Sequence, residues 1–157
     1  MDFIVEKLKE NGKIITCAES CTGGLLSSML VEKSGVSEVF KGSIVAYSNE
    51  IKISLLGVNK TTIEKYGAVS KECVKEMVIN SIKLINSDIS MAISGVAGPN
   101  GGTKEKPVGT VYIGVGNRDG KILIERFNFK GDRKKIQIQA SYKALKMVLQ
   151  LEEKLFF

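Results

Sequence analysis

The chain has 157 residues, a length that fits one compact domain, and its 43% hydrophobic and 25% charged residues are the balance of a soluble globular protein. It contains no histidine, which excludes Ser-His-Asp and Cys-His catalysis, histidine-ligated zinc and a histidine proton shuttle. The net charge is +6, which suits nucleic acid, an anionic membrane or small anionic ligands. The basic residues are spread along the chain and tryptophan is absent, so the sequence does not favour nucleic-acid binding.

Three cysteines, Cys17, Cys21 and Cys73, form an odd set without a second pair of metal ligands. Neither a metal site, a disulfide framework nor any other cofactor is expected from them. Residues 1–11 alternate charged and apolar side chains and therefore do not resemble a signal peptide. No apolar stretch approaches the roughly 20 residues that span a bilayer. We therefore expect a cytoplasmic protein with reduced thiols that does not bind a membrane.

The first half of the chain alternates helical and strand-like patterns. An amphipathic segment leads to a buried strand, and a glycine turn joins this strand to an apolar helix. In chain order we expect a helix over 3–12, a strand over 13–18, a helix over 25–31, a strand over 43–47 and a helix over 49–56. Residues 61–64 (TTIE) have the spacing of a capping box, which predicts a short helical turn there.

The second half begins with a long helix and then turns to strands. Ser70 is a good N-cap, and the apolar positions after it (Val74, Met77, Val78, Ile82 and Ile85, with Ser81) fall on one buried face. Strands follow over 89–94, 108–116 and 121–129, the last two forming a hairpin, and Asp132 caps a final helix to about residue 154. We predict a three-layer α/β/α sandwich with a mixed, mostly parallel sheet of about five strands and a late antiparallel hairpin.

Three unusual segments, residues 19–24, 48–52 and 95–107, follow predicted strands. Ligands of open α/β sheets bind beyond the carboxyl ends of the strands. If the strands are parallel, these segments converge on one edge, where we expect the functional site.

The first segment places Ser20 between a strand and a helix. The N–H groups of Cys21, Thr22, Gly23 and Gly24 would point outward, where they could hold a phosphate or a developing oxyanion. The alternative is that Ser20 or Thr22 merely caps the helix and the glycines merely form a turn. The segment is not a P-loop, because no Gly-Lys-Ser/Thr follows the glycines.

The second segment puts Lys52 about one helical turn past a strand end. Without histidine, a nucleophilic serine needs another base, and a partly desolvated lysine with a lowered pKa can serve. Tyr47 could orient this lysine or relay a proton. The alternatives are a solvated helix lysine for Lys52 and a core or rim aromatic for Tyr47.

The third segment is a glycine-rich loop that would let backbone approach a ligand closely. Lys104, Lys106 and Arg133 could meet an anionic group there. The alternative is a flexible surface loop that carries ordinary charges.

Together these residues resemble the CinA carboxy-terminal domain family. The resemblance rests on six blocks that occur in order: residues 18–24 (AESCTGG), 47–50 (YSNE) with Lys52, 67–70 (GAVS), 94–99 (SGVAGP) with Gly101 and Gly102, 106–111 (KPVGTV) and 131–133 (GDR). Each block is weak alone, but six in order over nearly the whole chain are specific. In these motifs the sequence departs from the family only at Val96, where isoleucine is common.

The resemblance implies hydrolysis of the carboxamide of nicotinamide mononucleotide to nicotinate mononucleotide and ammonia, which recycles pyridine nucleotide in bacteria. The family's serine, lysine and tyrosine match Ser20, Lys52 and Tyr47. The expected substrate-binding residues are Cys21, Thr22, Gly23, Gly24, Asn49, Gly95, Ala97, Gly98, Gly101, Gly102 and Arg133.

The resemblance also implies a single domain over residues 1–157, either the stand-alone form without the amino-terminal domain of many relatives or a domain separated from it. We expect a small nucleotide as the substrate and no nucleic acid, and a homodimer is possible. A second hypothesis is a catalytically weak nucleotide-binding or regulatory module of the same fold. A nucleic-acid-binding protein, motivated only by the positive charge, ranks last.

Overall fold

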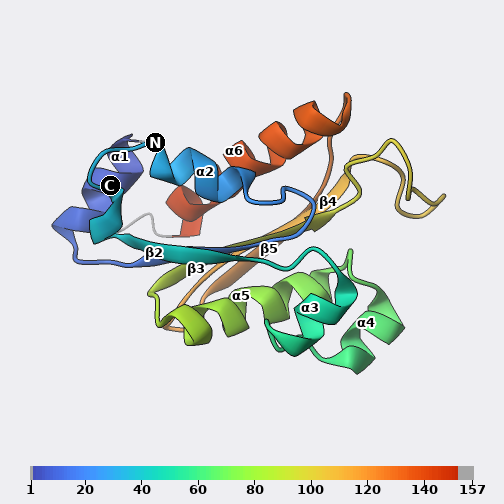
Figure 1. Cartoon of the computed structure of the whole chain (residues 1–157), viewed down its shortest axis with the longest axis horizontal. Coiled ribbons are helices and arrows are strands. Elements are labelled where there is room, and N and C mark those ends of the chain that lie inside the picture. The colour runs from blue at the N-terminus through green and yellow to red at the C-terminus, as the bar shows by residue number, and fades with distance from the viewer. Residues whose placement is uncertain (1, 152–157) are drawn as a thin grey trace.

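The computed structural model describes residues 2–151, which form a five-stranded sheet with helices on both faces (Figure 1). The strands are β1 (Ile15–Glu19), β2 (Phe40–Val45), β3 (Ile89–Gly95), β4 (Thr110–Asn117) and β5 (Ile122–Asn128). Their order in the sheet is β2-β1-β3-β4-β5. The β1 strand pairs parallel with β2 and β3, whereas β4 is antiparallel to both β3 and β5. The predicted mixed, mostly parallel sheet with a late hairpin is therefore confirmed.

The helices form one layer on each face of this sheet (Figure 1). One layer contains α1 (Asp2–Glu10), α2 (Leu25–Val31) and α6 (Arg133–Leu151). The other contains α3 (Asn49–Ser54), α4 (Lys60–Tyr66) and α5 (Lys71–Ile85), and a short 3-10 turn, η1 (Val36–Glu38), precedes β2. This arrangement confirms the predicted three-layer α/β/α sandwich.

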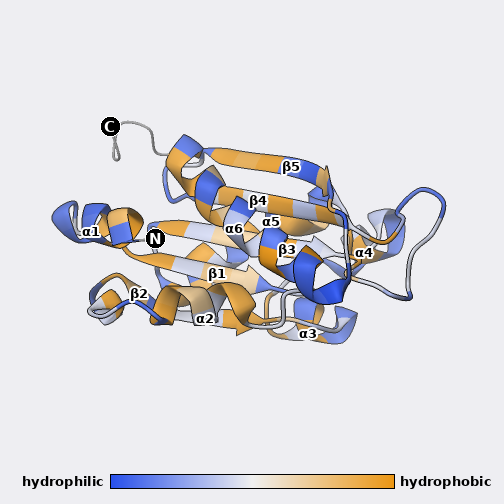
Figure 2. Cartoon of the chain, turned by 90° about the horizontal axis from the view of Figure 1, so that it is seen from above, coloured by the Kyte–Doolittle hydropathy of each residue, from blue (hydrophilic) through white to orange (hydrophobic). Residues whose placement is uncertain are grey.

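Two hydrophobic clusters hold the layers together. Hydrophobic residues predominate along the strands (Figure 2), and alternate strand positions face opposite layers. Met91 packs toward α1, α2 and α6, whereas its neighbour Ala92 packs toward α5. Gly114 of β4 lets α5 approach closely, because a Cβ there would lie 2.7 Å from a methyl group of Val74.

Two local expectations were wrong in detail. The second strand covers Phe40–Val45 rather than residues 43–47, since its parallel pairing with β1 begins at Phe40. Helix α4 begins one residue before Thr61, with Asn59 as its N-cap. The carboxylate of Glu76 accepts from the Asn59 N–H at 2.7 Å and from the Thr62 hydroxyl, so the capping acceptor comes from α5. The predicted end of the last helix near residue 154 lies outside the described residues.

The carboxyl ends of β2, β1 and β3 lie next to one another in the sheet. The three segments singled out in the sequence follow these ends and therefore converge on one edge, as expected. Within residues 2–151, no helix has both the length and the apolar character needed to cross a bilayer.

Candidate active site

Ser20 lies directly after β1, where a tight turn leads into α2. Its N–H donates to the Ile93 carbonyl at 3.0 Å, which extends the β1–β3 pairing by one residue. The Gly23 N–H donates back to the Ser20 carbonyl at 3.0 Å and closes the turn. Gly24 has a φ of 102°, a left-handed conformation that favours glycine. The backbone thus fixes Ser20, whose side chain is 7% exposed, at the edge of the sheet.

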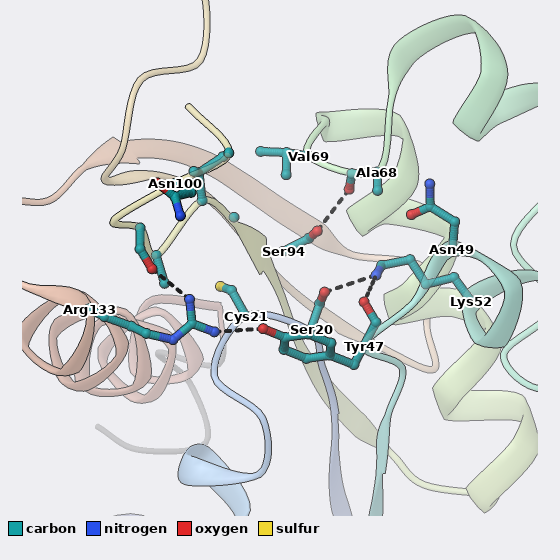
Figure 3. A pocket seen from close by; sticks show the side chains of 15 residues that line it. Ser20, Cys21, Tyr47, Asn49, Lys52, Ala68, Val69, Ser94, Asn100 and Arg133 are labelled. Carbon is teal, nitrogen blue, oxygen red and sulfur yellow. Dashed lines mark hydrogen bonds between the residues drawn. The ribbon is translucent and has the colours of Figure 1, made fainter. Parts of the chain in front are cut away.

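Lys52 extends from α3 to this serine. The Ser48 hydroxyl caps α3 by accepting from the Ile51 N–H at 3.1 Å, and Lys52 lies one turn into the helix. The lysine side chain is only 1% exposed. Its Nζ lies 2.9 Å from the Ser20 Oγ and donates to the main-chain carbonyl of Tyr47 at 3.3 Å (Figure 3). It also donates to the main-chain carbonyl of Ala46 at 2.9 Å.

The surroundings of Lys52 favour its neutral form. Burial lowers the pKa of this lysine, opposed by the nearby thiols of Cys73 and Cys21. Burial also raises the pKa of Cys21 to about 12 and that of Cys73 to about 11, so both thiols are uncharged near neutral pH. A buried amine with no anionic thiol beside it is suited to act as a base.

Tyr47 contacts the lysine through its backbone rather than its ring. The ring is 59% exposed, and its hydroxyl accepts from Arg133 Nη2 at 2.6 Å (Figure 3). The carbonyl is the Tyr47 atom that accepts from Lys52. Tyr47 therefore orients Lys52 through the main chain, and a proton relay through its hydroxyl stays a prediction.

Helix α6 contributes two side chains that hold the site together. Asp132 caps this helix by accepting from the Lys135 N–H at 2.9 Å, so Arg133 starts the first turn. Arg133 Nη1 donates to the Gly98 carbonyl at 2.7 Å. One turn later, Gln137 Nε2 donates to the Cys21 carbonyl at 2.8 Å. The last helix thus ties the glycine-rich loop, Tyr47 and the serine turn to one another.

These groups surround a cavity of about 280 Å³, the scale of a small ligand. Its wall contains two basic side chains, the buried Lys52 and the guanidinium of Arg133, and no acidic one. The wall is formed by Ser20, Cys21, Tyr47, Asn49, Lys52, Ala68, Val69, Ser94, Gly95, Val96, Ala97, Gly98, Asn100, Gly101 and Arg133. This charge distribution suits an anionic ligand. Within residues 2–151, no group of three or more cysteine or carboxylate side chains is placed to hold a metal ion.

Four residues expected to bind substrate do not line this cavity: Thr22, Gly23, Gly24 and Gly102. The expectation that the N–H groups of residues 21–24 all point outward without an acceptor is wrong for Gly23 and Gly24. The Gly23 N–H is bonded to Ser20, and the Gly24 N–H donates to the Glu19 carboxylate at 3.1 Å. Gly102 instead lines an adjoining groove of the same loop.

The two loop lysines also lie off the cavity wall. Lys106 is engaged elsewhere, because its amine donates to the Tyr66 carbonyl at 2.9 Å. Of the three basic residues considered as anion contacts, only Arg133 lines the cavity.

Five wall residues were not singled out as binding residues: Ala68, Val69, Ser94, Val96 and Asn100. The Ser94 hydroxyl donates to the Ala68 carbonyl at 2.8 Å, which brings the segment before α5 onto the cavity (Figure 3). That segment does not follow a strand, so the rule for parallel strand ends does not predict its place at the site. Its sequence signal was the GAVS block at residues 67–70.

Comparison with known proteins identifies the family. The family model described as CinA C-terminal domain matches residues 1–151. A CinA-like protein of Fervidobacterium nodosum is 52% identical over 147 residues, which cover 94% of this chain and 36% of that protein. A CinA-like protein of Thermotoga neapolitana is 51% identical over 144 residues, which cover 92% of this chain and 35% of that protein. The chain therefore spans about a third of the length of these curated relatives.

Solved structures agree with the fold. The competence/damage inducible protein CihA from Agrobacterium tumefaciens superposes with a TM-score of 0.92 at 34% identity, covering 94% of this chain and 90% of that one. A competence-damaged protein (CinA) superfamily protein from Klebsiella pneumoniae superposes with a TM-score of 0.90 at 37% identity, covering 98% of this chain and 93% of that one. The expected resemblance is thus confirmed over nearly the whole chain, which belongs to the CinA C-terminal domain family.

Proposed function

We propose that the chain hydrolyses the carboxamide of nicotinamide mononucleotide to nicotinate mononucleotide and ammonia, with Ser20 as the nucleophile and Lys52 as its base. The observation that carries this proposal is the 2.9 Å contact between the buried Lys52 amine and the Ser20 hydroxyl. An activated serine attacks an acyl carbon, and an amide is such a substrate. The guanidinium of Arg133 on the cavity wall supports a nucleotide as the molecule that carries this amide.

Two main-chain carbonyls fix the orientation of the Lys52 amine. A neutral amine has two N–H groups and one lone pair. The Ala46 and Tyr47 carbonyls accept the two N–H groups, which leaves the lone pair facing the Ser20 hydroxyl. Lys52 then removes the Ser20 proton as the serine oxygen attacks the carboxamide carbon.

The serine turn supplies N–H groups for the oxyanion of the tetrahedral intermediate. Cys21 and Thr22 are the residues of this turn whose N–H groups donate to no other residue in the described part of the chain. Each N–H shares a peptide plane with the preceding carbonyl, so a bond to that carbonyl fixes its direction. Gly23 holds the Ser20 carbonyl and Gln137 holds the Cys21 carbonyl. The Cys21 N–H is the principal donor, because Cys21 lines the cavity.

The protonated lysine completes the cycle. It gives its proton to the departing ammonia, which leaves an ester between Ser20 and the nicotinoyl carbon. A water molecule then attacks this ester while Lys52 takes its proton. Lys52 passes that proton to the Ser20 oxygen as the ester bond breaks, which releases nicotinate mononucleotide and restores the serine and the neutral lysine. We expect the substrate phosphate near Arg133, whose guanidinium lies on the cavity wall.

Ammonia release from nicotinamide mononucleotide by the purified chain tests the proposal. Ser20→Ala should lower the rate on the order of 10⁴–10⁶-fold and Lys52→Ala about 10²–10⁴-fold. Ser54→Ala and Lys71→Ala, at exposed positions, are the controls and should retain the parent rate. Full activity in Ser20→Ala would refute the mechanism. Tight binding of the mononucleotide without product would instead indicate a binding module.

A further inference from the structure

A buried carboxylate next to the proposed nucleophile takes no part in the chemistry described above. Glu19 ends β1, immediately before Ser20, and its side chain is 0% exposed. No lysine or arginine among residues 2–151 forms an ion pair with it. A buried carboxylate without a cationic partner is costly, so the groups that satisfy it indicate its role.

Backbone N–H groups at the start of α2 satisfy Glu19. Its Oε2 accepts from the N–H groups of Gly24 at 3.1 Å and Leu26 at 3.0 Å. Its Oε1 accepts from the Ser27 N–H at 2.8 Å and from the Ser27 hydroxyl. Gly24 is the N-cap of α2 and has no side chain to offer as a cap. Glu19 therefore performs the N-cap function from five residues upstream.

We propose that Glu19 is a positioning residue for the nucleophile, an inference that rests on the proposed Ser20 and Lys52 chemistry. Its carboxylate ties the end of β1 to the start of α2, and the turn that presents Ser20 is the short connection between them. With both ends held, the Ser20 hydroxyl stays within hydrogen-bond reach of Lys52. Because the Gly24 N–H donates to Glu19, it does not bind the oxyanion, and the Cys21 N–H takes that role.

The chemistry of the contacts requires a carboxylate at this position. All five groups around Glu19 donate, the fifth being the Cys17 thiol 3.8 Å from Oε1, and a carboxylate offers only acceptors. A glutamine of the same shape would direct its NH₂ group at two or three of these donors, whichever way the amide is turned. The Ser27 hydroxyl also lies 2.6 Å from the Ser43 hydroxyl, which connects the same cluster to β2.

Glu19→Gln is the first test, with folding checked by thermal unfolding before any rate is compared. We expect kcat for nicotinamide mononucleotide to fall about 10- to 100-fold, while KM changes less than about threefold. This split distinguishes a misplaced nucleophile from a loosened binding site. A folded Glu19→Gln protein with the parent kcat would overturn the proposal.

The second measurement does not depend on the substrate. Phenylmethylsulfonyl fluoride forms a sulfonate ester with an activated serine and releases fluoride, and mass spectrometry locates the label. The parent should be labelled at Ser20, and Glu19→Gln about 10-fold more slowly. A parent that is labelled at Ser20 but releases no ammonia would refute the proposed substrate, while the labelling rates still test Glu19. A parent that is neither labelled nor active would overturn both proposals.

A milder variant decides the matter if Glu19→Gln does not fold. Ser27→Ala removes one donor from Glu19 and should slow both labelling and turnover by about 2- to 10-fold. Its matched control is Ser81→Ala, which removes a hydroxyl paired with Ser90 at 2.6 Å near the opposite end of β3. The control should lose stability without losing rate. Equal rates in these two variants would then overturn the positioning role.

Discussion

The amine of Lys52 lies 2.9 Å from the hydroxyl of Ser20, although 32 residues separate them in the chain. The two side chains come from different elements, a turn after β1 and the short helix α3 that follows β2. Their contact depends on the parallel pairing of β1 and β2, which brings the two strand ends together.

Activity should depend on pH through Lys52. The lysine acts as a base only when neutral, and burial lowers its pKa below the ordinary value of 10.5. Activity is therefore expected to fall as pH decreases through this lowered pKa and to be retained above it. Initial rates of ammonia release across pH 5–10 measure the midpoint. A midpoint at the ordinary lysine value would show that Lys52 is not perturbed.

The same lysine should make stability depend on pH. Between its lowered pKa and 10.5, the unfolded chain binds one more proton at this site than the folded chain does. The free energy of unfolding of the parent should therefore rise with pH relative to Lys52→Met, by at most about 1.4 kcal/mol per pH unit. Urea unfolding at several pH values gives this difference. Lys60→Met, at a side chain that is 74% exposed, should show no such trend.

Tyr47→Phe separates the two roles of the tyrosine. The change keeps the carbonyl that contacts Lys52 and removes the hydroxyl that contacts Arg133. We expect kcat to stay near the parent value and KM to rise about 2- to 10-fold, because Arg133 loses one of its anchors. Tyr142→Phe, on the outer face of α6, is the control. A large fall in kcat would instead support the hydroxyl relay.

Arg133→Gln tests the position of the substrate phosphate. A hydrogen bond between charged groups is worth more than a neutral one, so KM for the mononucleotide should rise about 10- to 100-fold. The same variant should act on nicotinamide riboside, which lacks the phosphate, as the parent does. Lys134→Gln is the adjacent control, since Lys134 does not line the cavity. An equal effect on both substrates would place the phosphate elsewhere.

Gln137→Leu tests the support of the oxyanion donors. The variant removes the bond to the Cys21 carbonyl, which fixes the peptide plane of the Thr22 N–H, and kcat should fall about 10-fold. Gln139→Leu on the same helix is the matched control, because Gln139 also donates to backbone carbonyls, those of Lys130 and Lys135. It should leave kcat unchanged. Equal kcat values in the two variants would contradict this role for Gln137.

Local patterns in the sequence were sufficient to predict most of the fold. Alternating strand and helix signals gave the layer order, and Ser70 caps α5 as predicted, accepting from the Cys73 N–H at 3.2 Å. The convergence of the site followed from the rule for parallel strand ends. The N-cap of α4 escaped prediction because its capping acceptor, Glu76, comes from another helix.

The candidate site was predictable in its residue types but not in their atomic roles. Because the chain has no histidine, a nucleophilic serine needs another base, which favours a lysine such as Lys52. The structure brings this lysine to Ser20. Which atom of Tyr47 faces the lysine depends on the backbone path after β2, which no local pattern encodes. The role of Glu19 was also hidden, since a glutamate that ends a strand gives no sign that it will reach the next helix.

The length of the segment between Ser48 and Lys52 is as important as its composition. Ser48 fixes where α3 begins, and Lys52 lies four residues later. One inserted residue would advance the lysine by about 1.5 Å and turn it by about 100° around the helix, away from the serine. The exposed stretch from Thr103 to Glu105 lies off the cavity wall and carries no such constraint. Insertions and deletions should therefore be tolerated in that loop. Between Ser48 and Lys52 they should abolish the contact between the lysine and the serine, whatever residues they contain.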